Sequence, residues 1–203
     1  MLLLLWVVGL SAPADSALHA ASEPPTAVDR VAETLKKLTL DEKLSLLHGA
    51  PGNYTGNTPE IARLGIPAIR MNDGPQGFRS VPVSPPGTPT AWPCALAIAA
   101  TWDVASAAAW GAAMGDEFYR KGANVQLGPG LCIARVPRNG RNFEYISGED
   151  PVLGATLVGP VIEGIQANKI LANAKHFVNN NQETNRGDQS ANVDERTRFE
   201  MYY

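Results

Sequence analysis

The sequence predicts an α/β protein with a parallel sheet, and three observations lead to that prediction. Short apolar segments with the character of strands alternate with helical segments of roughly 15 to 20 residues, which is typical of parallel sheets. Polar residues follow several expected strands, at Asp73, in the stretch 135–144 and at Lys175–His176. This favours a (β/α) barrel over a doubly wound sheet, because a barrel assembles its active site at the C-terminal rim of its strands. No G-x-G-x-x-G turn is present, which argues against dinucleotide binding.

The composition is that of a folded, turn-rich protein. The 203 residues are 44% apolar and 18% charged, with 19 Gly, 16 Pro and a formal net charge of −3. These values exclude a disordered chain, and no basic excess indicates a nucleic-acid partner. The cysteines, Cys94 and Cys132, are too few for a disulfide-dense scaffold. Both lie in apolar runs where buried free thiols are as common as disulfides, so their pairing is left open.

The N-terminal elements follow from spacing and capping. A helix is expected over 27–37, with one apolar face formed by Val28, Val31, Leu35 and Leu38. The sequence Thr39-Leu40-Asp41-Glu42 is a capping box that opens a second short helix, which Gly49 ends. A turn-rich stretch over 51–59 precedes a strand expected over Ile66–Met71.

The later elements alternate between strand and helix. Strands are expected over 124–127 and 170–174, and helices over 104–121, over 151–168 and from 195 to Tyr203. Asp103, Asp150 and Asp194 precede these helices and are suited to cap them, because an aspartate accepts hydrogen bonds from free N–H groups of a first turn. The strand over 170–174 delivers Lys175 and His176.

The N-terminus predicts secretion. Residues 2–10 form an apolar run that is too short to span a bilayer, and small residues follow it. This pattern fits a signal peptide over about 1–20 that is cleaved within 14–21, although a buried N-terminal strand is an alternative. Asn53-Tyr54-Thr55 is an N-glycosylation sequon. We therefore expect an extracellular protein without a membrane anchor.

Several polar clusters are candidates for chemistry. Lys175 and His176 are expected to project to different sides of a strand end, where a solvated lysine and a core histidine are the ordinary alternative. The segment Arg138–Tyr145 combines two guanidinium groups, a carboxylate and aromatic rings, which suit a polyhydroxylated ligand. The run Asn179–Glu183 is dense in hydrogen-bonding side chains, and Asp73 alone is typical of a turn. No metal-binding motif or nucleophile elbow is present.

Taken together and in order, these segments resemble glycoside hydrolase family 3, in its β-glucosidase-type branch. The resemblance covers about residue 28 to Tyr203. Its segments are 71–75 (MNDGP), 99–103 (AATWD), 127–130 (LGPG), 135–145 (RVPRNGRNFEY), 147–151 (SGEDP) and 175–186 (KHFVNNNQETNR). Val178-Asn179-Asn180-Asn181 differs from the Pro-Gly-His-Gly that follows Lys-His-Phe in the family's N-acetylglucosaminidases, so that branch is not expected.

The resemblance implies a site for the terminal non-reducing sugar and hydrolysis with retention of configuration. Asp73, Arg141, Lys175 and His176 would line the pocket, with Asp73 accepting hydrogen bonds from hydroxyls and the three basic groups donating them. Arg186 would lie at the pocket edge or support the nucleophile. The substrate would be an oligosaccharide or a glucoside, with no cofactor and no metal.

The family's nucleophile, an aspartate, and its acid/base, a glutamate, are expected after Tyr203. The chain is therefore expected to be the N-terminal portion of a (β/α)8 TIM-like barrel that is incomplete and inactive alone, because such a barrel takes about 250 residues. The expected parts are the signal peptide over 1–20, N-terminal helices and an entry loop over 21–60, and the partial barrel over 61–203. The alternatives are a sugar-binding module without catalysis, a β-xylosidase, or a Schiff-base lyase that uses Lys175. The exact sugar, the linkage and the oligomeric state stay open.

Overall fold

The structure is a computed structural model that describes residues 26–80, 85 and 87–203. The chain separates into two compact units, Met1–Leu38 and Thr39–Tyr203. The expected signal peptide lies outside the described residues.

Helix α1 (Ala27–Lys37) of the first unit has the predicted bounds. Its N-cap is Thr26, whose hydroxyl accepts a hydrogen bond from the Asp29 amide (3.2 Å) while the Asp29 carboxylate accepts one from the Thr26 amide (3.0 Å). This reciprocal capping is local, so it needs no contact beyond the first turn. The apolar face of the helix is exposed at Val28, Val31 and Leu35.

The second unit begins with helix α2 (Leu40–Leu47), whose predicted capping box is present. The Thr39 hydroxyl accepts a hydrogen bond from the Glu42 amide, and the Glu42 carboxylate accepts one from the Thr39 amide. The same carboxylate forms an ion pair with Arg63, which lies within a short 3-10 turn over Ala62–Leu64. Glu42 therefore both caps the helix, together with Thr39, and attaches it to the following turn.

Four strands form one sheet in the order β1-β2-β3-β4. The strands are β1 (Gly56–Asn57), β2 (Arg70–Asp73), β3 (Val125–Leu127) and β4 (Leu171–Ala172). Strands β2, β3 and β4 pair in parallel, which confirms the predicted parallel sheet, and β1 pairs antiparallel with β2. Asp73, at the C-terminal end of β2, lies in register with Leu127 at the end of β3.

The strand predictions differ from the structure in bounds and in number. The strand expected over 170–174 is limited to Leu171–Ala172. The strand expected over 66–71 begins only at Arg70 and extends to Asp73, because Ile66 pairs with Ile61 across a tight turn and Pro67 has no N–H to donate to a sheet. Strand β1 lies within the stretch over 51–59 that composition predicted as turns. Its pairing partner is distant in sequence, so local composition did not indicate it.

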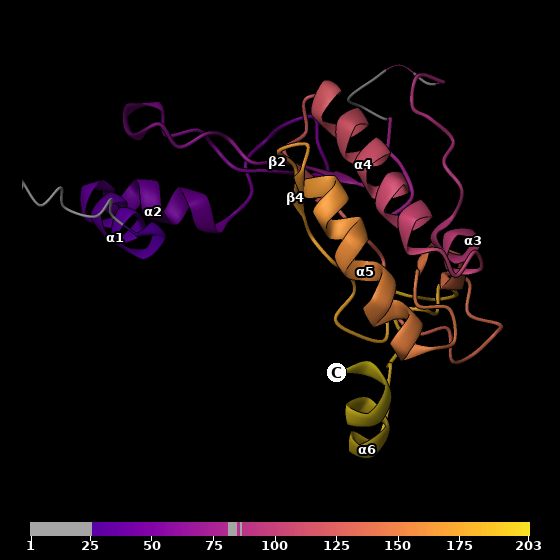
Figure 1. Cartoon of the computed structure of the whole chain (residues 1–203). Coiled ribbons are helices and arrows are strands. Elements are labelled where there is room, and N and C mark those ends of the chain that lie inside the picture. The colour runs from indigo at the N-terminus through magenta and orange to yellow at the C-terminus, as the bar shows by residue number, and fades with distance from the viewer. Residues whose placement is uncertain (1–25, 81–84, 86) are drawn as a thin grey trace, which may run out of the picture. The chain divides into compact units, whose positions relative to one another are not determined.

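Helices α4 (Val104–Arg120) and α5 (Pro151–Gln166) lie side by side (Figure 1). Asp103 and Asp150 cap them as predicted, accepting hydrogen bonds from the Ala105 and Val152 amides. Gly111 permits the close approach, since a Cβ there would lie 2.4 Å from the Val161 carbonyl oxygen. The short helix α3 (Ala95–Ala99) precedes α4 and is buried at Ala95, Ile98 and Ala99.

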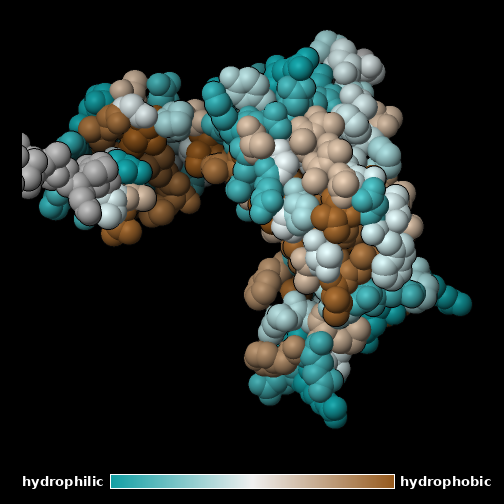
Figure 2. All heavy atoms as spheres, in the orientation of Figure 1, coloured by the Kyte–Doolittle hydropathy of each residue, from teal (hydrophilic) through white to brown (hydrophobic). Residues whose placement is uncertain are grey.

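The core lies mainly between these helices and the sheet. Its largest members are Phe78, Trp110, Met114, Phe118, Ile146, Leu157, Val161, Ile165 and Ile170. Apolar atoms also reach the surface along α5, where Val152 is exposed (Figure 2). At the chain end, Asp194 caps α6 (Glu195–Thr197) as predicted, and the helix continues as a π-helical turn over Arg198–Tyr202.

Candidate functional site

A polar pocket of about 430 Å³ lies at the C-terminal ends of the parallel strands. The residues that line it are Asp73, Arg141, Lys175, His176, Asn180, Arg186 and Gly187. All five side chains that the sequence singled out as sugar-binding candidates are in this set. Because they come from separate segments of the sequence, the fold brings them together.

Strand pairing positions the two sides of the pocket. Asp73 ends β2, and the preceding side chain, Asn72, points into the interior, where its amide donates to the Arg79 carbonyl (2.9 Å). Lys175 follows β4, and its backbone amide donates to the Pro129 carbonyl (2.9 Å) while its own carbonyl accepts from Leu131 (2.7 Å). Lys175 is thereby fixed beside the loop that follows β3.

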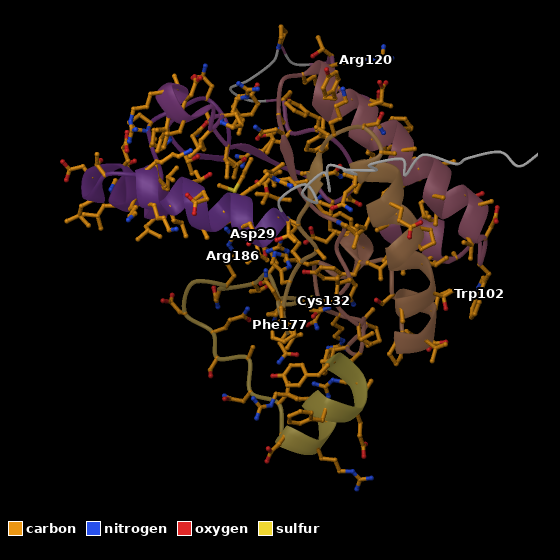
Figure 3. The ribbon with its side chains drawn as sticks, turned by 60° about the vertical axis from the view of Figure 1, so that its left-hand side comes forward. Asp29, Trp102, Arg120, Cys132, Phe177 and Arg186 are labelled. Carbon is orange, nitrogen blue, oxygen red and sulfur yellow. The ribbon has the colours of Figure 1, made fainter. Side chains whose placement is uncertain are left out.

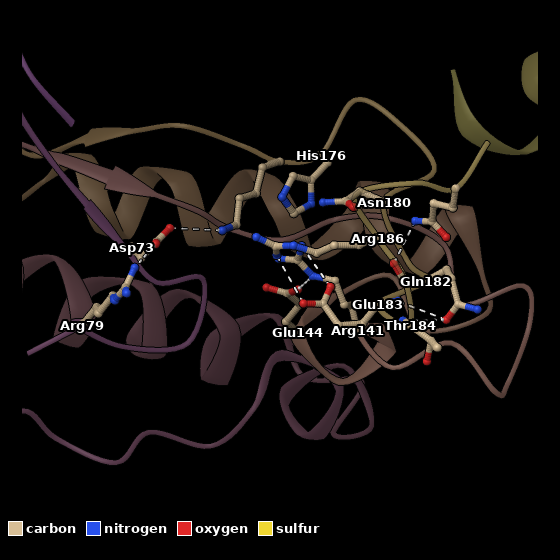
Figure 4. Close-up of polar contacts among 12 residues, drawn as sticks. Asp73, Arg79, Arg141, Glu144, His176, Asn180, Gln182, Glu183, Thr184 and Arg186 are labelled. Atoms are coloured by element: carbon tan, nitrogen blue, oxygen red, sulfur yellow. Dashed lines mark hydrogen bonds and ion pairs between the residues drawn. The ribbon is translucent and has the colours of Figure 1, made fainter. Parts of the chain in front are cut away.

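Asp73 faces two cations, one at each carboxylate oxygen (Figure 4). Its Oδ1 lies 3.7 Å from the Lys175 Nζ, and its Oδ2 lies 3.2 Å from Nη1 of Arg79. The Lys175 side chain is only 14% exposed, so this ammonium group is not a solvated surface charge. The ammonium group therefore faces the Asp73 carboxylate inside the pocket.

Arg141 binds two carboxylates from different segments. It forms an ion pair with Glu144, on the short 3-10 turn Asn142–Glu144, and its Nη1 lies 3.7 Å from Glu183. Its side chain is 17% exposed and that of Glu144 is 8% exposed. Burial lowers the pKa of Arg141, but the hydrogen bond and charge of Glu144, together with the charges of Tyr145 and Glu183, outweigh burial, so the net pKa is raised. Arg141 therefore enters the pocket as a fixed cation.

The two polar runs around the pocket are connected by hydrogen bonds. The Arg141 amide donates to the Asn181 carbonyl (3.0 Å), and the buried Asn181 side chain donates to the Ile133 carbonyl and to Asn142. The segment 138–145 is therefore held in place by the segment that follows β4.

His176 is held by contacts on its ring and on its backbone. Its Nδ1 lies 3.1 Å from the hydroxyl of Tyr145, which also donates to the Asn180 carbonyl. The Cys132 thiol donates to the His176 carbonyl (3.3 Å). Burial, with the charges of Lys175 and Arg141, lowers the pKa of His176 to about 4, so the imidazole is neutral at pH 7.

The expectation that Lys175 and His176 project to different sides was wrong, because both side chains line the same pocket. Regular pairing of β4 ends at Ala172, and the strand alternation that the expectation assumed no longer applies beyond it.

Arg186 lies at the edge of the pocket on an exposed turn. Its side chain is 63% exposed and its Nη1 lies 3.2 Å from the Glu183 carboxylate. Figure 3 shows Arg186 and Phe177 on the segment that follows β4, with Trp102 on another part of the unit, at the start of α4. Arg186 therefore contributes an exposed cation at the rim of the pocket, whereas Arg141 and Lys175 contribute much less exposed ones.

Sequence reasoning missed several members of the site. Asn180 and Gly187 line the pocket, Arg79 pairs with Asp73, and Tyr145 supports His176. Asn180 and Tyr145 lie in the dense polar runs that marked their segments, but which members face inward depends on the tertiary contacts. Nothing in the sequence near Arg79 indicated its role.

The described residues show no disulfide, metal cluster or membrane span. Cys94 and Cys132 are both free thiols. Within 26–80, 85 and 87–203, no group of three or more His, Cys, Asp or Glu could hold a metal ion. The helices in this part of the chain are all too short or too polar to cross a bilayer.

Comparison with known proteins gives one consistent family. The model of the "Glycosyl hydrolase family 3 N terminal domain" matches residues 53–201. Beta-glucosidase B of Emericella nidulans is 40% identical over 173 residues, covering 85% of this chain and 20% of that protein. A beta-glucosidase of Rhizobium radiobacter is 43% identical over 171 residues, covering 84% of this chain and 20% of that protein.

Solved structures agree. DesR, a beta-glucosidase from Streptomyces venezuelae in complex with D-glucose, matches with a TM-score of 0.78 and 41% identity, covering 85% of this chain and 22% of that one. Beta-glucosidase 3B from Thermotoga neapolitana in complex with glucose matches with a TM-score of 0.69 and 38% identity, covering 77% and 24%. The predicted α/β barrel class is confirmed, and this chain spans about a fifth to a quarter of the length of these relatives.

Proposed function

This chain belongs to glycoside hydrolase family 3, and on that premise we propose that it forms the part of a β-glucosidase that holds the terminal non-reducing glucosyl unit. The observation that carries the proposal is the convergence of Asp73, Arg141, Lys175 and His176 on one pocket lined by polar side chains and a glycine. Two related structures that match this chain are complexes with glucose.

The chemistry of the pocket suits a polyhydroxylated ring. Each sugar hydroxyl both donates and accepts a hydrogen bond, whereas Lys175 and Arg141 only donate and the Asp73 carboxylate only accepts. Hydrogen bonds to charged groups contribute about 1.5–3 kcal/mol each. Asp73 and Lys175 already face one another at 3.7 Å, so one hydroxyl could bind both groups.

We propose hydrolysis with retention of configuration, which needs a nucleophilic carboxylate and an acid/base carboxyl about 5–5.5 Å apart. Among the described residues that line the pocket, Asp73 is the one carboxylate. Both of its oxygens face cations, which suits holding hydroxyls rather than attacking an anomeric carbon. Neither catalytic carboxylate is therefore assigned to the described lining of this pocket.

A segment exchange tests this function. Residues 39–203 replace the matched segment of the Rhizobium radiobacter enzyme, and hydrolysis of 4-nitrophenyl β-glucoside is measured. We expect an active chimera, with Lys175→Ala lowering kcat/KM by about 10- to 150-fold, the equivalent of one charge-assisted hydrogen bond. Lys43→Ala, at an exposed position of α2, is the control and should leave kcat/KM unchanged.

The stereochemistry is read in the same chimera by proton NMR, where β-glucose should appear first. An active chimera whose kcat/KM is unaffected by Lys175→Ala would contradict the pocket assignment, and first release of α-glucose would contradict retention.

Secretion is proposed on the sequence of residues 1–20 and on the exposure of Asn53 in its sequon. Expression in a eukaryotic secretory host should yield a secreted protein whose N-terminal residue lies within 15–22. Retention of the intact N-terminus inside the cell would contradict the proposal.

A further inference from the structure

The contacts of the Tyr145 hydroxyl determine which His176 nitrogen carries the ring proton. This hydroxyl contacts the backbone carbonyl oxygen of Asn180 and the Nδ1 of His176, which lies 3.1 Å away. The Cys132 thiol also interacts with it, but the thiol proton is donated to the His176 carbonyl oxygen. Tyr145 is fully buried, and its hydroxyl therefore satisfies its hydrogen bonds with these protein partners.

A phenol has one proton to donate and lone pairs to accept. The Asn180 carbonyl oxygen has no proton, so the close contact between the two oxygens requires the Tyr145 proton. The hydroxyl can then only accept from His176, so the proton of this hydrogen bond belongs to Nδ1.

The other ring nitrogen, Nε2, forms no hydrogen bond with the described residues. His176 lines the pocket, and its Nε2 has no hydrogen-bond partner within the part of the chain that the structure describes. The neighbouring cations Lys175 and Arg141, together with burial, keep the ring neutral by lowering its pKa, while the carboxylates of Glu144 and Asp73 oppose them more weakly. A neutral ring with a proton on Nδ1 leaves a lone pair on Nε2.

We propose that Tyr145 is a positioning residue that holds His176 as the Nδ1–H tautomer, so that Nε2 accepts a hydrogen bond from a hydroxyl proton of the bound sugar. The ligand in this proposal rests on the proposed function, whereas the tautomer does not. His176 then differs from Lys175 and Arg141, which donate, and it departs from the expectation that all three basic groups donate.

The tautomer is measured directly in the 203-residue chain. With 15N-labelled histidine, long-range proton–nitrogen correlation spectra at pH 7 distinguish a protonated ring nitrogen from one with a lone pair. His48→Gln and His19→Gln variants assign the signals, since the chain has three histidines. For His176 we expect a protonated Nδ1 and an unprotonated Nε2, and a protonated Nε2 would overturn the proposal.

Tyr145→Phe tests the role of the hydroxyl, because it retains the buried ring and removes the acceptor. We expect the His176 signals to move toward the Nε2–H form. Tyr54→Phe is the matched control, since it removes a hydroxyl that donates to the Lys121 carbonyl (3.0 Å) outside the pocket and should leave His176 unchanged. A Tyr145→Phe spectrum with an unchanged tautomer would show that Tyr145 does not set it. If this variant does not fold, the wild-type spectrum still decides the tautomer.

Glucose added to the active chimera, labelled in the same way and with a His176→Gln chimera to identify the signals, separates this proposal from the proposed function. A fixed Nδ1–H tautomer with no response of Nε2 to glucose would preserve the role of Tyr145 and contradict the sugar site. If glucose binds while the His176 ring is protonated on Nε2, the sugar site is supported and the role of Tyr145 is contradicted. With both correct, the Nε2 signal shifts on binding and Nδ1 stays protonated.

Discussion

Replacing Arg141 by methionine should destabilise the second unit through the carboxylate that loses its partner. Glu144 is 8% exposed on its side chain, and Arg141 is the cation that pairs with it. Glu183 also contacts Arg141, but it keeps Arg186 at 3.2 Å. The cost of the substitution therefore falls on Glu144.

The magnitude follows from burial. Breaking a buried ion pair by removing one partner costs about 3–5 kcal/mol, because an uncompensated charge remains. Arg141 is 17% exposed, so we expect the lower end, about 3 kcal/mol. With a urea slope of about 2 kcal/mol/M, the unfolding midpoint should fall by about 1.5 M.

Arg186→Met is the matched control, because it breaks an ion pair whose side chains are 63% and 46% exposed. Exposed pairs contribute about 0–1 kcal/mol, so this midpoint should move by less than about 0.5 M. Adding Glu144→Gln to Arg141→Met removes the unpaired charge and should restore at least about 1 kcal/mol. Equal shifts for the two arginine variants, or no recovery with Glu144→Gln, would refute the reasoning.

Three further predictions concern titration, packing and thiols. The pKa of His176 is about 4 in the folded chain and about 6.5 in the unfolded chain, so between these pH values the unfolded state binds the proton more readily. The free energy of unfolding should therefore fall as the pH drops from 6.5 to 4. An NMR titration in which His176 of the folded chain protonates near pH 6.5 would contradict this. Gly111→Ala should lower the free energy of unfolding, measured in urea, by about 1–3 kcal/mol, because the new Cβ would lie 2.4 Å from the Val161 carbonyl oxygen. Gly159→Ala is the control and should be neutral or stabilising, because nothing lies within 4 Å of its Cβ position. Equal effects of the two substitutions would refute the close packing of α4 and α5. In denaturant without reductant, Cys94 and Cys132 should both react with a thiol reagent. In the native chain, Cys132, which is 2% exposed, should react far more slowly than Cys94. If neither cysteine reacts in denaturant, the two form a disulfide and the prediction is wrong.

Local sequence was sufficient wherever the determining contact lies within one helical turn. Thr39, Asp103, Asp150 and Asp194 each cap the helix that they were predicted to begin. A cap is a hydrogen bond between residues two or three apart, so the residues that form it are visible in the sequence. The parallel sheet was predicted on a different basis, the alternation of strands and helices along the chain.

Only the tertiary structure decided the strand limits and the membership of the pocket. Strand β1 exists because β2 offers it a partner, and β2 begins at Arg70 because the preceding residues pair elsewhere. The sequence could indicate that Asp73 and Lys175 each follow a strand, but their 3.7 Å separation depends on the register of three strands.

The same distinction holds for the chemistry of the site. The sequence marked Arg141 and His176 as polar groups suited to a sugar, but which carboxylate pairs with Arg141 and which nitrogen of His176 carries the proton depend on distant partners. Burial removes water as a competing partner, so these contacts fix charge and tautomer. Residue types are given by the sequence, whereas the protonation and orientation of those residues follow from the side chains that the fold places around them.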